Sequence, residues 1–505
     1  MPDTQEEYQV EADGVPARVK ILEKEDEYVL NYHVDRPEID TATEAVLQEL
    51  KEKIVKHVNL STDEFVDSKA LDNVKDKFRE EAMELLEEEL PKTNDQTKDI
   101  LIGNLIHEML GLGDIEIVLN DENLEEIVIN GSDEPAWVYH KEDGWLKTNI
   151  EFEEEDEIYN YASEIGRRVG KNISSLHPLL DAHLSTGDRT NATLYPISTQ
   201  GNTITIRKFA RDPWTITDFI ANGTIDREVA AFLWLCLQYE LNILVSGGTG
   251  AGKTSLLNVL MPFIPPNQRV LSIEDTREVS LPEFLHWVPL TTREPNPEGK
   301  GGVSMLDLLV NALRMRPDRI LVGEIRKKQQ AEVLFEAMHT GHSVYSTLHA
   351  DTAEQTVRRL VNPPIDVPKT MVDAVDVNVV MFRDRRRNFR RAMEVAEITE
   401  NGEDEIDADV IYEWQSKEDE IEKKQESQAI YETLKLHAGM TREEMNENIE
   451  EKKDVLRWME ENDVNTVDGV GQVIAEYYSE KENVMELVEN DMDPEELDSS
   501  IESDN

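Results

Sequence analysis

Apolar residues recur along the chain with two spacings, and the spacing changes from segment to segment. Spacings of three and four residues, typical of amphipathic helices, occur in residues 41–58, 69–90, 100–110 and 156–169. Alternating or short apolar runs, typical of strands, occur in residues 27–34, 115–119, 126–129, 136–139, 145–150, 189–195 and 203–209. The pattern predicts an accessory helical or α/β module over residues 1–95 and an α/β domain over residues 96–210.

After residue 226, short apolar runs alternate with amphipathic segments. The strand candidates are residues 243–245, 270–273, 320–322 and 344–347, and the helix candidates between them include residues 305–313 and 331–338. Such alternation predicts a parallel sheet with helices on both faces. A last hairpin is predicted to join residues 377–382 to residues 391–398. We therefore expect a linker over residues 211–226 and an α/β domain over residues 227–400.

Beyond residue 400 the composition becomes acidic and the apolar spacing becomes helical. Residues 428–436, 442–460 and 467–478 have enough apolar positions to pack together. We expect a helical appendage over residues 401–490. The acidic stretch over residues 491–505 has few apolar residues and is expected to be disordered.

The charge of the chain narrows the classes of partner. Its 505 residues include 107 acidic and 52 basic side chains, which gives a formal net charge of -55. Such a field opposes direct binding to nucleic acid or to an anionic membrane surface. Because the acidic residues are spread over the whole chain, we expect adaptation to a high-salt cytoplasm and a halophilic source. An acidic tail that binds a partner would explain only the C-terminal excess.

Cysteine usage and hydropathy indicate the compartment. Cys236 is the single cysteine, which rules out an intrachain disulfide framework and a cysteine-based zinc site. The first residues are acidic and lack the apolar core of a signal peptide. The most apolar segment, residues 230–245, is interrupted by polar residues and is too short to span a membrane. We expect a cytoplasmic protein that reaches the membrane only through a partner.

A glycine-rich loop supplies the clearest chemistry. The sequence LNILVSGGTGAGKTSLL places the pattern G-x-x-x-x-G-K-[ST] between a predicted strand and a predicted helix. Glycines let consecutive backbone N–H groups face one concavity, and the positive end of the helix dipole faces the same anion. The predicted nucleoside triphosphate site consists of Gly247, Gly248, Thr249, Gly250, Ala251, Gly252, Lys253, Thr254 and Ser255. In this pattern Lys253 reaches the β- and γ-phosphates, and the Thr254 hydroxyl binds Mg²⁺.

Carboxylates end two other predicted strands. Glu324 ends RILVGEI, where the carboxyl end of a parallel strand lies beside the loop, and it can polarise a water toward the γ-phosphate. Gly323 stands where a metal-side aspartate is usual, which leaves Thr254, waters and other carboxylates to hold Mg²⁺. Glu274 and Asp275 can hold a metal-bound or attacking water, or they can cap the loop after their strand. The pattern leaves both readings open.

Histidines follow in MHTGHSVYSTLHAD. Zinc binding by His339, His342 and His349 is disfavoured because no cysteine or glutamate stands at helical metal spacing with them. A hydrogen bond from His349, at a strand end, to a phosphate or a carboxylate is more plausible. His339 falls in the last turn of a predicted helix, where a structural role is the alternative.

Arginines form a basic island in this acidic chain. Its members are Arg383, Arg385, Arg386, Arg387, Arg390 and Arg391. We favour a hairpin tip that balances local acid, including that of a sister subunit, over a contact surface for an anionic partner. The predicted strands before residue 210 carry Arg189 and Arg207, whose spacing alone gives them little weight.

The ordered motifs GGTGAGKTS, IEDTRE, LRMRPDRILVGEIR and TGHSVYSTLHADTA resemble those of the secretion and pilus-assembly ATPases of the type II/type IV secretion superfamily. The resemblance covers about residues 100–400. It implies a ring hexamer in which ATP and Mg²⁺ lie between a RecA-like C-terminal domain and a mobile N-terminal domain. It assigns Lys253 and Thr254 to phosphate and Mg²⁺, and Glu324 to catalysis. It also assigns Glu274 to an acidic box and His342 and His349 to a histidine box.

The resemblance extends to the first α/β domain. RTNATLYP and TITIRKF look like the N-terminal segments that supply arginines to the nucleotide, which implies this role for Arg189 and Arg207. NALRMRPDR, PNPEGKGG and the helical tail look most like the archaeal branch, and the four-cysteine zinc insert of many bacterial members is missing. The expected fold class is α/β: a RecA-like P-loop ATPase domain with a preceding α/β domain, an extra N-terminal module and a helical C-terminal appendage.

The expected function is that of a motor ATPase. It would drive a polytopic membrane platform protein to assemble or secrete pilin-like subunits, without direct contact with nucleic acid. The resemblance leaves an archaellum motor as the first alternative. Further alternatives are a conjugation or DNA-uptake ATPase and a nucleotide-gated scaffold without useful hydrolysis, for which Gly323 is the support.

Overall fold

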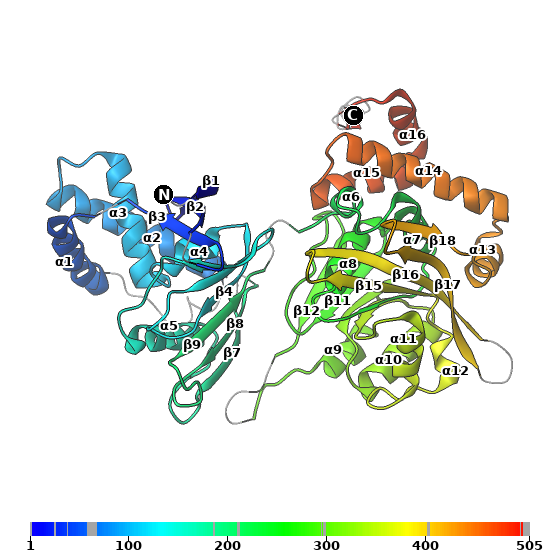
Figure 1. Cartoon of the computed structure of the whole chain (residues 1–505), viewed down its shortest axis with the longest axis horizontal. Coiled ribbons are helices and arrows are strands. Elements are labelled where there is room, and N and C mark those ends of the chain that lie inside the picture. Colours follow the sequence, from blue (N-terminus) through cyan, green and yellow to red (C-terminus); the bar gives the residue numbers. More distant parts are fainter. Residues whose placement is uncertain are drawn as a thin grey trace. The chain divides into compact units, whose positions relative to one another are not determined.

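The structure is a computed structural model. It describes residues 3–24, 27–37, 39–57, 68–184, 187–209, 213–293, 295, 299–400, 405–494 and 496–497. The chain divides into two compact units, unit 1 (Met1–Arg211) and unit 2 (Asp212–Asn505). Each unit has its own nine-stranded sheet and its own apolar clusters. Figure 1 labels their helices and strands.

The sheet of unit 1 is continuous across residue 95. Its strands, in spatial order, are β1 (Asp3–Ala12), β2 (Val15–Glu23), β3 (Asn31–Asp35), β6 (Gly144–Thr148), β5 (Trp137–His140), β4 (Leu124–Ile129), β9 (Thr203–Arg207), β8 (Arg189–Thr193) and β7 (Leu179–His183). Neighbours are antiparallel except for the parallel pair β3 and β6. Residues 1–95 therefore contribute three strands to the same sheet as residues 96–210.

The helices of unit 1 mostly follow the apolar spacing. The predicted helices are confirmed as α1 (Thr41–His57), α2 (Ser68–Glu89), α3 (Asp95–Leu110) and α5 (Glu155–Arg168). The strand predicted over residues 115–119 is wrong, because these residues form helix α4 (Ile115–Asn120). A short apolar run does not distinguish strand from buried helix. Here packing against β1 and β4 decides for helix.

Unit 2 is built on the predicted parallel sheet. Its parallel strands, in spatial order, are β12 (His286–Thr291), β11 (Arg269–Glu274), β13 (Arg319–Glu324), β14 (Ser343–Leu348), β10 (Ile243–Gly247) and β15 (Val377–Asp384). Three antiparallel strands follow: β16 (Phe389–Glu400), β17 (Ile406–Gln415) and β18 (Glu420–Lys423). Along β10, Ile243 and Val245 join one apolar cluster and Leu244 joins another, so the sheet is buried on both faces.

Helices cover both faces of this sheet, which confirms the prediction. The first cluster contains α6 (Ile216–Ala221), α7 (Arg227–Gln238) and α8 (Lys253–Leu260). The second contains α9 (Met305–Ala312), α10 (Lys328–His339), α11 (Ala353–Val361) and α12 (Lys369–Val372). Helix α6 lies within the segment predicted to be a linker, where a reciprocal Thr215–Asp218 capping box starts it.

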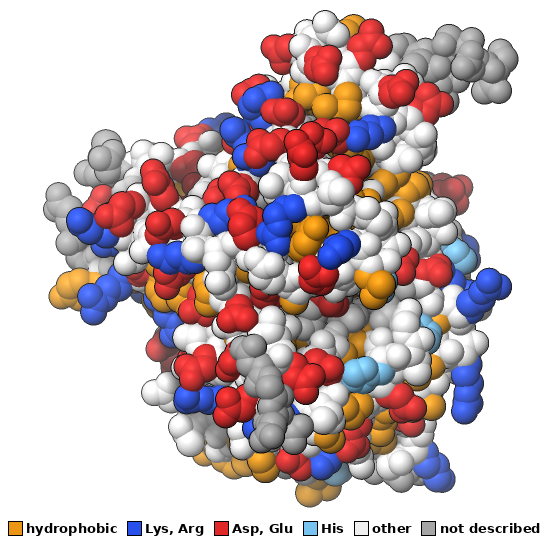
Figure 2. All heavy atoms as spheres, turned by 90° about the vertical axis from the view of Figure 1, so that its right-hand side faces the viewer, with side chains coloured by type: hydrophobic (Ala, Val, Ile, Leu, Met, Phe, Trp, Pro, Cys, Tyr) orange, Lys and Arg blue, Asp and Glu red, His pale blue; other side chains and the backbone are white. Residues whose placement is uncertain are grey.

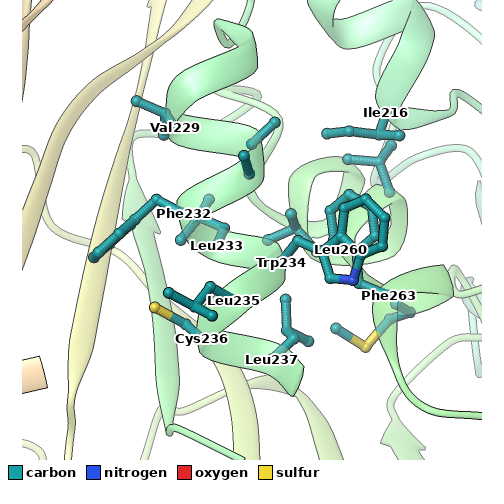
Figure 3. Packing of buried hydrophobic residues seen from close by; sticks show 14 of the residues in the cluster. Ile216, Val229, Phe232, Leu233, Trp234, Leu235, Cys236, Leu237, Leu260 and Phe263 are labelled. Atoms are coloured by element: carbon teal, nitrogen blue, oxygen red, sulfur yellow. The ribbon is translucent and has the colours of Figure 1, made fainter. Parts of the chain in front are cut away.

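Helix α7 explains the most apolar segment of the chain. All residues from Val229 to Leu237, including Cys236, are buried. In Figure 3 its side chains point to several sides of the helix, and Trp234 stacks on Phe263 with 5.0 Å between ring centroids. A helix that is apolar all round belongs in a core. Among the described residues, no helix is long and apolar enough to cross a membrane.

The end of the chain is partly sheet, contrary to the prediction of an all-helical appendage over residues 401–490. Strands β17 and β18 extend the sheet, because Ile411 and Tyr412 are buried against its core. The helices that follow are α13 (Ala429–Ala438), α14 (Arg442–Glu461), α15 (Val467–Ser479) and α16 (Lys481–Asn490). Within the tail predicted to be disordered over residues 491–505, Leu497 is buried beyond α16, whereas residues 495 and 498–505 lie outside the described residues.

One face of the protein shows how its acidic side chains are distributed. On the face shown in Figure 2, acidic side chains are spread across the surface with lysines and arginines between them. The charge of this face is therefore mixed locally, as the even distribution of acidic residues along the sequence indicates.

Candidate active site

The glycine-rich loop joins β10 to α8 at the carboxyl end of an interior parallel strand. Gly247, Gly250 and Gly252 have φ angles of 148°, 72° and 89°, in the region that favours glycine. A Cβ atom on Gly247 would also lie 2.4 Å from the Met381 carbonyl oxygen of β15. The glycines are therefore required both by the backbone conformation and by the close approach of a neighbouring strand.

Lys253, the first residue of α8, is held across the loop. Its Nζ atom donates to the Gly248 carbonyl at 3.0 Å and lies 3.3 Å from Nδ1 of His349. Burial lowers the pKa of Lys253, while the negative charges of Glu324, Asp351 and Glu278 oppose this shift. The ammonium group thus lies in a partly desolvated site among carboxylates.

His349 links Lys253 to Glu324. Its Nε2 atom lies 3.3 Å from Oε1 of Glu324, and its Nδ1 atom faces the ammonium group of Lys253. An ammonium only donates hydrogen bonds, so Nδ1 is the acceptor and Nε2–H donates to the carboxylate. This neutral tautomer agrees with the pKa of His349, which burial and the positive charge of Lys253 lower. The structure therefore brings together three of the predicted site residues.

Arg326 is a site residue that the sequence pattern did not reveal. Its Nε and Nη2 atoms donate to Oε2 of Glu324 at 2.9 and 2.8 Å. Its Nη1 atom donates to Oδ2 of Asp275 at 3.1 Å. Arg326 therefore joins the carboxylates that end two different strands and holds the side chain of Glu324 in place. The only signal for it was its position two residues after Glu324.

Gly323 lies at an irregularity in the sheet. The pairing of β13 with β14 shifts between Val322 and Glu324, and the Thr347 hydroxyl donates to the Gly323 carbonyl at 2.6 Å. A Cβ atom on Gly323 would have its nearest neighbour at 3.8 Å, so a side chain is not excluded there by close contact. Bulges redirect the side chains beside them, and this one adjoins Glu324.

The residues at the loop fit a nucleoside triphosphate with Mg²⁺. Gly247, Gly248, Gly250 and Gly252 have no Cβ atoms that could block an approaching anion, and the buried Lys253 supplies a cation. Thr254 follows in α8 with its hydroxyl, and Ala251, Gly252 and Ser255 complete the predicted set. Asp351, which the sequence pattern missed, has Oδ1 at 3.3 Å from a Cβ position on Gly248 and offers a hard oxygen ligand for Mg²⁺.

Glu274 is buried at the end of β11. Its Oε1 atom accepts from the backbone N–H groups of Glu278 and Val279 at 2.9 and 3.1 Å. Its Oε2 atom has no partner among the described residues. These contacts are those of the capping alternative, and a catalytic role for Glu274 stays a prediction. Burial raises the pKa of Glu274 to about 7.

This raised pKa predicts a pH-dependent stability. Between pH 4.5, the ordinary pKa of a glutamate, and about pH 7, the folded protein holds the Glu274 proton that the unfolded chain releases. The contribution of Glu274 to the free energy of unfolding therefore falls as pH rises through this window, by about 3 kcal/mol. Glu274→Gln keeps an oxygen acceptor and removes the titration. Denaturant unfolding at pH 4.5, 6 and 8 should show the variant gaining stability relative to the parent as pH rises, whereas the exposed Glu283→Gln should show no such trend.

The remaining predicted site residues lie elsewhere. His342 immediately precedes β14, at the opposite end of the strand from His349, and its Nδ1 atom is 3.3 Å from the Thr340 hydroxyl. Arg189 and Arg207 face each other across β8 and β9 of unit 1. Arg189 donates to both carboxylate oxygens of Asp181, at 3.2 and 2.9 Å. The structure thus does not bring His342 to the loop, and the contact of the two arginines with a nucleotide stays a prediction.

Comparison with known proteins places these features in a family. Residues 115–485 match the family model described as type II/IV secretion system protein. An uncharacterized protein of Methanocaldococcus jannaschii is 40% identical over 337 residues, which cover 65% of this chain and 60% of that relative. The type IV secretion system protein PtlH of Bordetella pertussis is 31% identical over 307 residues, which cover 54% of this chain and 89% of PtlH. Among solved structures, the ATPase DotB of Legionella pneumophila is 22% identical with a TM-score of 0.41, over 56% of this chain and 79% of DotB.

The matched range contains the P-loop, the strands that end in Glu274 and Glu324, and the strand that His349 follows. The predicted fold class is confirmed as well, since unit 2 has the P-loop on an interior strand of a parallel α/β sheet and an α/β unit precedes it. The family resemblance inferred from the motifs is thereby confirmed, and the chain belongs to the type II/IV secretion system protein family.

Proposed function

We propose that this protein hydrolyses ATP and converts the free energy into domain motion that assembles or secretes pilin-like subunits. The observation that carries the proposal is the line of contacts from Lys253 through His349 to Glu324 at the P-loop. Mg²⁺ bound with the nucleotide would neutralise phosphate charge, held by the Thr254 hydroxyl and oxygens such as those of Asp351. The chemistry that remains for the protein is to position the attacking water and take its proton.

Each residue of this line has a separate task in the proposal. Lys253 exchanges the Gly248 carbonyl for the phosphates, because an anion binds an ammonium more strongly than a neutral carbonyl does. Glu324 orients the attacking water and accepts its proton. His349 and Arg326 fix the Glu324 carboxylate from opposite oxygens, so its position is set before the substrate arrives. The bonds on Glu324 lie entirely within unit 2.

The mechanical part of the proposal concerns unit 1. Arg189 and Arg207 would approach the γ-phosphate in the closed state, and hydrolysis would release them. We propose a homo-hexamer at the cytoplasmic face of the membrane, coupled to a polytopic platform protein and making no direct contact with nucleic acid. Family membership and the similarity to PtlH, a type IV secretion system protein, support this assignment. The chain spans only 60% of the length of its M. jannaschii relative, so these partners are part of the proposal.

The purified chain tests this function directly. In molar KCl, which suits the proposed high-salt origin, we expect phosphate release from ATP that requires Mg²⁺. Light scattering with a non-hydrolysable ATP analogue should give about six times the 57.8 kDa mass of one chain. Tight ATP binding without hydrolysis, even beside the platform protein, would instead indicate a nucleotide-gated scaffold. Strong stimulation by DNA would contradict the proposed substrate class.

A further inference from the structure

The basic island divides into three groups in the structure. Arg385, Arg386 and Arg387 are exposed at the tip of the β15–β16 hairpin. Arg391 is buried, and its Nε and Nη2 atoms donate to the two carboxylate oxygens of Asp419, each at 2.8 Å. The third group, Arg383 and Arg390, is half-buried and lies against the P-loop. The prediction that the arginines balance nearby acidic side chains therefore holds for Arg391, whereas Arg383 and Arg390 have a different environment.

Arg383 and Arg390 contact the middle of the loop. Nε of Arg390 donates to the Gly250 carbonyl at 3.2 Å. A Cβ atom on Gly250 would lie 2.8 Å from Nη1 of Arg383, and one on Gly252 would lie 3.2 Å from Cδ of Arg390. The two arginines are directly opposite each other in the β15–β16 ladder. The hairpin therefore places two guanidinium groups from the same chain beside the predicted phosphate site.

The bond from Arg390 orients a loop peptide. A trans peptide group is planar, so its carbonyl and its N–H point in opposite directions. Because the Gly250 carbonyl is directed to Arg390, the N–H of Ala251 is directed to the other side, where it donates to the Gly248 carbonyl at 3.3 Å. That carbonyl is also the acceptor for Lys253. The Ala251 N–H and the Lys253 ammonium thus converge on one acceptor position inside the loop.

The charges around the loop are arranged in two sets. Glu324, Asp351 and Glu278 act on Lys253, whereas Arg383 and Arg390 lie against the glycines. Like charges directly opposite each other in a ladder are unfavourable. A bound polyanion would relieve that repulsion and would also meet the N–H groups of the loop. The carboxylate set suits Mg²⁺, and the arginine set suits phosphate.

We propose that Arg383 and Arg390 are positioning residues that set the affinity of the P-loop for a nucleoside di- or triphosphate. Arg390 holds the Gly250–Ala251 peptide with its N–H directed into the loop, and both guanidinium groups add positive potential that the phosphates offset. The inference rests on the proposed function, because it concerns the same nucleotide site. It assigns part of that site to a hairpin far along the chain, since Arg390 and Gly250 are 140 residues apart.

Nucleotide affinity and steady-state kinetics test this role. We expect Arg390→Gln to raise both the Kd for a fluorescent ADP analogue and the KM for ATP about tenfold, with kcat changed by less than about twofold, because a charge-assisted contact that preorganises binding is lost. Arg383→Gln should act in the same direction. Arg390→Lys keeps the charge and a donor, and should recover part of the affinity.

Matched variants on the same hairpin separate this role from general charge and from folding. Arg387→Gln removes the same charge from the exposed tip and should leave Kd and KM within about twofold of the parent. Arg391→Gln should lower the thermal midpoint without changing KM, since it breaks the pair with Asp419. In about 1 M KCl the Debye length is only about 3 Å, so the effect of Arg390→Gln should persist there if it reflects contact with the loop.

Two results would overturn the inference. One is an unchanged Kd and KM in Arg390→Gln and Arg383→Gln while Lys253→Ala has lost binding, which would leave the proposed function standing. The other is an equal effect of Arg387→Gln on Kd and KM, which would mean that Arg383 and Arg390 act only through the general positive potential of the hairpin. If Arg390→Gln does not fold, unchanged affinity and unchanged kinetics in both Arg390→Lys and Arg383→Gln would contradict the proposal. Binding and hydrolysis that survive Lys253→Ala would instead contradict the proposed function itself.

Discussion

Lys253→Ala is expected to abolish nucleotide binding and to lower ATP hydrolysis by at least about 100-fold, the size of effect seen when one preorganised charge-stabilising group is removed. Lys253 supplies the buried ammonium at the loop, where it donates to the Gly248 carbonyl and contacts His349. Its alanine variant leaves the glycine turns intact but removes the cation that the β- and γ-phosphates need. Binding of a fluorescent ADP analogue and phosphate release are the two measurements.

The control for this variant is the substitution of a lysine that lies away from the loop. Lys328 on α10 pairs with Asp366 at 2.7 Å and is half exposed. Lys328→Ala should leave binding and hydrolysis within about twofold of the parent, because surface ion pairs contribute little. Retention of nucleotide binding by Lys253→Ala at the parent affinity would contradict the nucleotide site derived from the loop.

Glu324→Gln is expected to separate binding from hydrolysis. The variant should bind ATP at least as tightly as the parent, because it removes a negative charge near Lys253. Its kcat should fall by about 10²- to 10⁴-fold, the range that general acid–base catalysis contributes. Glutamine preserves the side-chain volume and an acceptor for Arg326, so the fold is disturbed little, while its NH2 group replaces the Oε1 acceptor of His349. Single-turnover phosphate release and equilibrium binding of ATP measure the two effects.

An exposed glutamate provides the matched control for this second variant. Glu332 on α10 lies 4.0 Å from Lys328 at the surface, and Glu332→Gln should leave kcat unchanged. If Glu324→Gln retained kcat within about threefold, a different residue would have to accept the proton of the attacking water. Glu274 would be the next residue to test, because its pKa is raised and its Oε2 atom has no partner in the part of the chain that the structure describes.

The local sequence pattern predicted most helices and strands whose apolar residues recur with a clear helical or strand spacing. The helices over residues 41–58 and 69–90 are within a few residues of α1 and α2, and the parallel strands of unit 2 are in place. The failures concern segments whose conformation is decided by packing or by strand pairing and not by their own spacing of apolar residues. Residues 115–119 became helix through packing against β1 and β4, and β17 is a strand because it pairs with β16. The residues of β17 and β18 are as polar and acidic as those of the helices that follow, so composition did not distinguish these strands from helices.

The candidate site shows the same division. Glu324 was found because a carboxylate at the end of a parallel strand lies at the edge where ligands collect. Arg326 was missed because its two carboxylate partners end different strands, and Arg390 because it reaches a loop 140 residues away. An arginine gives the same signal in a sequence whether it is solvated, paired with an aspartate or set against a loop.

The sequence by itself determined the phosphate loop and its chemistry. The loop consists of nine contiguous residues that include glycines at positive φ, a lysine and a threonine. Because the local backbone geometry of these residues forms the loop, it can be recognised from neighbouring positions in the sequence. Only the tertiary structure decided which charges surround that loop. Lys253 and His349 are 96 residues apart, and their contact depends on β14 lying beside β10. The physical reason is that burial and strand pairing, which sum over many distant residues, place these side chains, whereas the loop is set by the conformations of its own residues.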